Sequence, residues 1–170
     1  YLLSDYKYVE KLLSSYGVRL SFTGHYHAQD ISQVTEDSGA VLYDVETGSL
    51  STPPCSMRFC TISGNSITLK SDYLIESYSA DFISASMEFV KKTIYNEAYD
   101  TLKGYYVSDD NADYIANTVA SAYVAHYNGD ENLAEKVSVD KSKLSLWGRF
   151  IYSQYEYVIE GLWKDLPPAD

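Results

Sequence analysis

The chain has few of the residues that bind nucleic acids or carry out chemistry. Its 170 positions hold 3 histidines, 2 cysteines and 13 lysines or arginines, against 24 aspartates or glutamates. The resulting net charge of −11 repels phosphate backbones, which argues against nucleic-acid binding driven by counterion release. No apolar run approaches the roughly 20 residues that a membrane-spanning helix needs. We therefore expect neither a nucleic-acid scaffold nor a membrane span.

The cysteines, the tyrosines and the first residue give weaker indications of the disulfide state, the location and the full length of the protein. Cys55 and Cys60 would face opposite sides of an ideal strand, so we expect two unpaired, buried thiols unless a bend brings them together. The 18 tyrosines and the shortage of basic residues suit an exported, periplasmic or extracellular, bacterial protein. The first residue is Tyr1 rather than methionine, and we expect the gene product to be longer.

Apolar spacing predicts one helix and several strands in the first part of the chain. Residues 5–16 have helical spacing, and Gly17 follows where a left-handed C-cap residue belongs. Residues 18–23 form a short, β-rich, mostly apolar run typical of a buried strand. A period of two, broken by Pro and Gly-Asn turn signals, then predicts further strands at 40–48, 57–64 and 66–75.

The later part of the chain has the spacing of amphipathic helices. Helical stripes cover residues 80–104, 109–128 and 144–163, and glycines end the first two. The predicted fold class is therefore a mixed α/β portion over residues 1–75, followed by an all-helical region over residues 76–170.

Two features of the helical region have ordinary structural explanations. The acidic run 109–113 has the carboxylate spacing of an EF-hand but lacks its glycine and final acid, so we interpret it as a helix N-terminus. We expect the aromatic residues of the last helix to belong to the core; these are Trp147, Phe150, Tyr155 and Trp163.

The histidine pair is the strongest candidate for chemistry. His25 and His27 follow Gly24 directly after the predicted strand 18–23. In an extended backbone, residues i and i+2 project to the same side, so the two imidazoles would enter one space. Imidazole is a good ligand for Zn, Mn and Fe. Two exposed turn histidines would give the same pattern, so both interpretations stay open at this point.

The sequence around this pair resembles a known family. "LSFTGHYH" is similar to the G-H-x-H motif of calcineurin-like metallophosphoesterases, and "VETGSLSTPPCSMRFCTIS" is similar to the strands that follow that motif. The resemblance covers roughly residues 5–75. It implies that this portion is part of an αββα sandwich. It also implies that the helical region is a C-terminal extension.

The resemblance implies a dinuclear hydrolase of small phosphoester substrates. Its cofactors would be two divalent metal ions (Mn, Fe or Zn), with His25 and His27 each binding one of them. Metal-bound hydroxide would hydrolyse a phosphomonoester or a phosphodiester. The adjacent residues Thr47, Gly48 and Ser49 would lie near the site without an assigned role.

The family's other motifs, D-x-H, G-D-x-x-D and G-N-H-D/E, are not in this sequence. The third histidine, His126, is expected near a helix end, where it interacts with the helix dipole rather than with a metal. We therefore expect a C-terminal portion of the enzyme that is inactive alone. Its partners would be the N-terminal half of the same enzyme or a second copy of itself.

Two other functions are compatible with the sequence. The chain could be a non-catalytic protein-interaction module derived from a phosphoesterase core. It could also be a zinc-binding domain that uses His25, His27 and a nearby carboxylate such as Asp30, although no third ligand stands at a familiar spacing.

Overall fold

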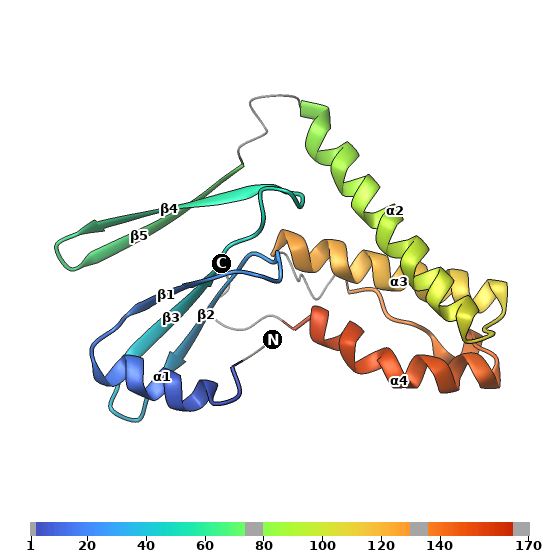
Figure 1. Ribbon diagram of the computed structural model, residues 1–170, viewed down its shortest axis with the longest axis horizontal. Coiled ribbons are helices and arrows are strands. Elements are labelled where there is room, and N and C mark those ends of the chain that lie inside the picture. Colours follow the sequence, from blue (N-terminus) through green and yellow to red (C-terminus); the bar gives the residue numbers. More distant parts are fainter. Residues whose placement is uncertain (1–2, 74–79, 130–135, 165–170) are drawn as a thin grey trace.

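The computed structural model describes residues 3–73, 80–129 and 136–164 (Figure 1). Within these ranges the fold is mixed α/β, with two small sheets and with helices in the C-terminal half. The division expected at residue 75 and the last two residues of the strand predicted over 66–75 lie outside the described residues. In chain order the long elements are α1 (Tyr6–Ser15), β1 (Leu20–Thr23), β2 (Asp30–Thr35), β3 (Val41–Glu46), β4 (Ser56–Ser63), β5 (Ser66–Tyr73), α2 (Ala80–Gly104), α3 (Asp109–Asn128) and α4 (Leu146–Leu162).

The first helix ends as the sequence predicts. Gly17 has a φ of 78°, the left-handed conformation that glycine adopts without steric cost. The Gly17 amide donates to the Ser14 carbonyl at 3.0 Å, and the Val18 amide donates to the Leu13 carbonyl at 3.0 Å. This pair of bonds is a Schellman motif. It reverses the chain so that β1 can begin three residues later.

The first sheet has the strand order β1-β3-β2. The central strand β3 runs parallel to β1 and antiparallel to β2. Strand β2 was not predicted, because its apolar residues Ile31 and Val34 do not alternate with polar ones. Its pairing with β3 therefore holds it in place more than its own pattern does.

The second sheet is the hairpin β4–β5 (Figure 1). Ser63 pairs with Ser66 across the two-residue turn, and Gly64 has a φ of 57°, as the Gly-Asn signal predicts. Both cysteines are free, as expected. Cys55 is buried just before β4, but Cys60 is exposed on the hairpin, so the expected burial is wrong for Cys60.

The three long helices share the larger apolar core. α3 lies between α2 and α4 and packs against both (Figure 1). None of the helices in the described ranges has a stretch long and apolar enough to cross a membrane. The buried core consists of Leu102, Val107, Ala112, Ile115, Ala116, Ala122, Val139, Leu144, Ile151, Tyr152, Ile159, Leu162 and Trp163.

The expectation of an aromatic core in the last helix is only partly correct. Trp163 is 4% exposed, but Trp147, Phe150 and Tyr155 are 49%, 54% and 40% exposed. α4 packs on α3 through another face, and the rings of Trp147 and Phe150 stack on each other at 5.3 Å. Which face of α4 meets α3 depends on tertiary packing, so the periodicity alone did not identify the buried face.

A buried amide joins the start of α3 to the start of α4. The Asn111 Oδ1 atom accepts a hydrogen bond from the Ser145 amide at 2.9 Å, and the Ser145 hydroxyl accepts one from the Gly148 amide at 3.0 Å. These bonds satisfy two of the donors at the N-terminus of α4. A Cβ at Gly148 would lie 2.6 Å from Asn111 Oδ1, so the contact requires glycine.

We expect Gly148→Ala to lower the free energy of unfolding by about 1–3 kcal/mol, because Asn111 must move and lose its bonds. Gly161→Ala on the same helix is the control, since a Cβ there meets nothing within 4 Å. It should raise stability by up to about 1 kcal/mol through helix propensity. Urea unfolding of both variants measures the difference. Equal effects of the two substitutions would contradict the proposed role of the Asn111 contact.

Asp140 caps the short 3-10 turn Lys141–Lys143 before α4. Hydrogen bonds from the Ser142 hydroxyl (2.6 Å) and the Ser142 amide (2.9 Å) lower the pKa of Asp140 below its usual value. A lowered folded-state pKa contributes stability above the unfolded pKa and loses it as the pH falls. We expect Asp140→Ala to lower the melting temperature at pH 7, with a smaller difference from the wild type below about pH 4. A difference that is constant with pH would contradict this assignment.

Candidate functional site

The histidine pair lies on the loop that joins β1 to β2, at the carboxyl end of β1 (Figure 1). Both side chains are exposed. His25 has a φ of 92° and His27 a φ of 61°, so the extended backbone assumed from the sequence is wrong. Positive φ is uncommon for residues other than glycine and costs of order 1–3 kcal/mol when the surroundings impose it. Such strain concentrates at functional sites, which makes this loop the leading candidate.

His27 is oriented by a hydroxyl group from a distant part of the chain. Its Nδ1 atom lies 2.8 Å from Thr52 Oγ1. When Nδ1 carries the ring proton it donates to that oxygen, and Nε2 is then the nitrogen with a free lone pair. Metal-binding histidines are commonly held in this way by a partner on the other ring nitrogen. The loop before β4 thus fixes the ring of the second histidine.

If His27 binds a metal ion, Thr52→Val should weaken that binding by about 10- to 100-fold, the usual effect of removing such a partner. Thr52→Ser keeps the hydroxyl and is the matched control. A valine variant that binds Mn²⁺ as tightly as the serine variant would show that the bond to His27 has no role in orienting a ligand.

The residues after β3 lie beside the histidine loop, as expected. The Thr47 amide donates to the Thr23 carbonyl at 3.1 Å, which ties the end of β3 to the end of β1. A Cβ at Gly48 would lie 2.7 Å from Ser56 Oγ and 3.4 Å from the His27 carbonyl oxygen. Glycine is therefore required at position 48 for the two loops to approach each other closely.

Glu46 is the last residue of β3, near the histidine loop. The backbone of Tyr26, between the two histidines, is near enough to influence the pKa of the Glu46 carboxyl group. Burial raises the pKa of Glu46 above its usual value, while the Tyr26 amide and the charge of His126 oppose that rise. Asp30, its direct partner across the β2–β3 ladder, adds to the rise. A half-buried carboxylate beside another acid is unfavourable for stability.

The C-terminal end of α3 closes against the same loop. His126 lies in the last turn of α3, where the sequence predicts it, close enough to Glu46 to affect its charge. Gly129 caps α3 with a φ of 67°, and a Cβ there would overlap the Gln29 carbonyl oxygen. Ala28 and Gln29 are buried, with 1% and 6% of their surfaces exposed. The helical region thus forms one wall of the histidine loop.

The donors on the loop suit a metal ion but do not complete a site for one. His25 and His27 offer imidazole nitrogens, and Thr52 holds one ring in the way that ligand histidines are held. Within residues 3–73, 80–129 and 136–164, no group of three or more His, Cys, Asp or Glu side chains is arranged to bind a metal. The loop can therefore contribute ligands, and a full set requires further residues.

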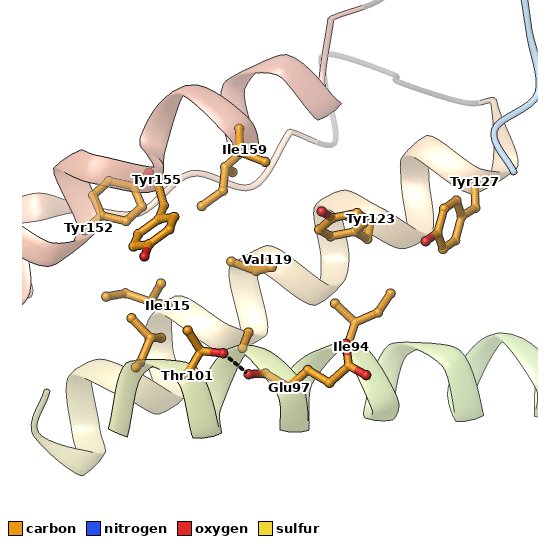
Figure 2. A pocket seen from close by; sticks show the side chains of 13 residues that line it. Ile94, Glu97, Thr101, Ile115, Val119, Tyr123, Tyr127, Tyr152, Tyr155 and Ile159 are labelled. Carbon is orange, nitrogen blue, oxygen red and sulfur yellow. Dashed lines mark hydrogen bonds between the residues drawn. The ribbon is translucent and has the colours of Figure 1, made fainter. Parts of the chain in front are cut away.

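A separate cavity lies in the helical region. It has a volume of about 390 Å³ and is lined only by residues of α2, α3 and α4 (Figure 2). Among these lining residues, Glu97 is the one charged side chain, which leaves the cavity without a set of metal ligands. Figure 2 shows its walls, which are Ile94, Glu97, Ala98, Thr101, Leu102, Ile115, Val119, Tyr123, Tyr127, Tyr152, Tyr155, Val158 and Ile159.

The sequence identified the two histidines but not the residues that hold them. Thr52 and Glu46 are 25 and 19 positions from His27, and no motif links them to it. Strand register brings Glu46 opposite Asp30, and register could not be predicted without β2. Comparison with known proteins finds neither a family model nor a curated protein that matches the chain. The functional site is therefore argued from the geometry of the loop.

Proposed function

We propose that this chain supplies one wall of a dinuclear metal site in a phosphoesterase of the calcineurin-like type. In this proposal it is the C-terminal portion of the enzyme, and residues outside these 170 positions provide the remaining ligands. His25 and His27 are the ligands that we assign to it. The observation that carries the proposal is the bond between Thr52 and His27, on a loop where both histidines have positive φ.

The resemblance of "TGHYH" and the segment after β3 to that family supports the same site, because the structure places Thr47 and Gly48 against the His27 loop. The mixed α/β sheet β1-β3-β2 is compatible with part of an αββα sandwich. The metallophosphoesterase sandwich itself is part of the proposal.

The two histidines and the residues packed beside them have defined roles in this proposal. The Thr52 hydroxyl fixes which nitrogen of His27 faces the site, and Gly48 lets the neighbouring loop pass close to it. The exposed positions of both histidines allow a second part of the protein, and then a substrate, to approach. Bound divalent ions would neutralise charge on the phosphoryl group. They would also lower the pKa of a water molecule, which could then attack the phosphorus.

The test is hydrolysis by the intact protein encoded by the gene. We expect it to hydrolyse p-nitrophenyl phosphate or bis-p-nitrophenyl phosphate only with added Mn²⁺, Fe²⁺ or Zn²⁺, and EDTA to abolish the activity. The two substrates distinguish a monoesterase from a diesterase. The 170-residue chain alone should have no activity on either. Lack of hydrolysis by the intact protein with every metal would contradict the proposal.

The exposed aromatic surface favours a second candidate, a non-catalytic interaction module. Tyr106, Leu146 and Phe150 are 89%, 84% and 54% exposed, and the Trp147 indole nitrogen donates to the Tyr105 carbonyl at 2.8 Å. Exposed apolar patches of this kind mark interaction sites. If the intact protein binds no metal, and Trp147→Ala abolishes binding of a partner protein, this candidate replaces the enzyme.

A further inference from the structure

The cavity between α2, α3 and α4 has the size and the lining of a site for a small organic molecule. Its volume of about 390 Å³ falls within the range of about 300–1,000 Å³ that is usual for ligand pockets. All three helices contribute side chains to its walls (Figure 2). These side chains are aliphatic or aromatic except for Glu97 and Thr101. A ligand that fits this cavity therefore has a mainly apolar body.

Four tyrosines give the cavity an aromatic lining. Tyr123 and Tyr127 come from α3, and Tyr152 and Tyr155 come from α4 (Figure 2). The rings of Tyr123 and Tyr127 are tilted against each other, with their centroids 6.0 Å apart. The Tyr155 hydroxyl donates a hydrogen bond to the Tyr105 hydroxyl at 3.1 Å, which orients the Tyr155 ring. Because the faces of aromatic rings attract cations within about 6 Å, this lining favours a positively charged ligand.

One of the four rings already has a cation over it. Lys141 Nζ lies 5.9 Å from the centroid of the Tyr152 ring, within the range of cation–π attraction. Lys141 does not line the cavity, so it leaves the interior open. Within residues 3–73, 80–129 and 136–164, no lysine or arginine lies over the other three cavity tyrosines. Their ring faces are therefore available to a ligand.

Glu97 is the only charged side chain in the lining, and no basic residue neutralises it. The Thr101 hydroxyl donates to the Glu97 backbone carbonyl at 2.7 Å rather than to its carboxylate (Figure 2). In the part of the chain that the structure describes, Glu97 forms no salt bridge. A carboxylate beside an apolar cavity attracts a cation and repels an anion. Three lysines of the helical region are paired with other acids, in the salt bridges Lys103–Asp109, Lys136–Glu160 and Lys141–Glu156.

We propose that this cavity binds a small organic cation, in which an ammonium group is attached to an apolar body. The ammonium group lies near the Glu97 carboxylate and the tyrosine rings, and the apolar body contacts the aliphatic side chains of the three helices. Binding forms no covalent bond and requires no metal. The proposal does not rest on the phosphoesterase activity proposed above, since neither histidine of the loop lines the cavity.

The test is an NMR titration of the complete 170-residue chain with three probes. Benzyltrimethylammonium carries a cation on an aromatic body, benzylsulfonate carries an anion on the same body, and benzyl alcohol is uncharged. We expect the cation to give saturable shifts of the Tyr123, Tyr127 and Tyr155 ring resonances. Its dissociation constant should be roughly three- to thirtyfold lower than that of either other probe. No saturable shift with the cation, or equal or tighter binding of another probe, would overturn the proposal.

Glu97→Gln tests the role of the charge. It should weaken the binding of benzyltrimethylammonium by about two- to fivefold, as expected for an ion pair at an exposed position, and leave the binding of benzyl alcohol unchanged. Asp100→Asn is the matched control, because it removes one charge from an exposed position on α2 that does not line the cavity. Equal weakening by the two substitutions would mean that the overall negative charge attracts the cation, and the proposed site would be wrong.

Substitutions that fill the cavity test its location. Thr101→Phe introduces a ring from an exposed position on α2, and Ala98→Phe does so from a half-buried one. Each should abolish saturable binding, and thermal melts show which variants stay folded, since overpacking can destabilise a core. Trp147→Ala removes an exposed indole, the best alternative ring for a cation, and should leave binding unchanged. Binding that is lost in Trp147→Ala and retained in a folded Thr101→Phe variant would overturn the proposal.

Discussion

Gly129→Ala is expected to lower the free energy of unfolding by about 2–5 kcal/mol. The substitution combines a left-handed conformation, which costs a residue with a Cβ about 1–2 kcal/mol, with a collision against backbone, which typically adds about 1–3 kcal/mol. Gly129 has a φ of 67°, and its new Cβ would overlap the Gln29 carbonyl oxygen. Denaturant unfolding at constant pH measures the loss.

Gly17→Ala separates these two causes. Gly17 also has a positive φ, of 78°, but a Cβ there meets nothing within 4 Å. It should therefore cost only the conformational part, about 1–2 kcal/mol. The difference between the two variants reports the contact of α3 with the histidine loop. Equal losses would mean that α3 does not approach Gln29 as closely as the structure shows.

Substitution of either loop histidine is expected to have the largest effect on activity. In the intact phosphoesterase that we propose, His25→Ala or His27→Ala should lower kcat by more than about 100-fold, since loss of a ligand's partner alone costs 10- to 100-fold. Stability should change little, because both side chains are exposed. Steady-state kinetics at saturating Mn²⁺ give the values.

Tyr26→Phe is the control for those two variants. It changes a side chain within the same loop and leaves both histidines in place. Its kcat should stay within about threefold of the wild type, as expected when no interaction of the transition state is removed. Histidine variants with kcat values like that of Tyr26→Phe would exclude both residues as ligands.

Local signals in the sequence predicted much of the secondary structure. Glycines at helix ends, such as Gly17 and Gly129, and the Gly64-Asn65 turn act within a few residues, so their effects can be derived from the chain alone. Strand β2 was missed because its apolar residues do not alternate, and its place depends on pairing with β3. The exposure of Trp147 was missed because it depends on which face of α4 meets α3.

The candidate site also has features that the sequence could predict and features that it could not. His25 and His27 are two positions apart in the sequence, so their pairing was visible at once. Their positive φ values were not, because the conformation of the loop depends on tertiary contacts such as the one between His27 and Thr52. The proximity of His126 to Glu46 joins residues 80 positions apart. Such contacts follow from tertiary packing rather than from any local pattern.

The number of metal ions held by this chain tests the account most directly. The wild type and the His25→Ala/His27→Ala double variant would be incubated with Mn²⁺ or Zn²⁺, freed of excess metal and analysed for bound ions. The account predicts weak binding of less than one ion per wild-type chain and less still in the double variant, because the described residues do not form a complete site. Two tightly held ions per wild-type chain, or equal metal in both proteins, would contradict it.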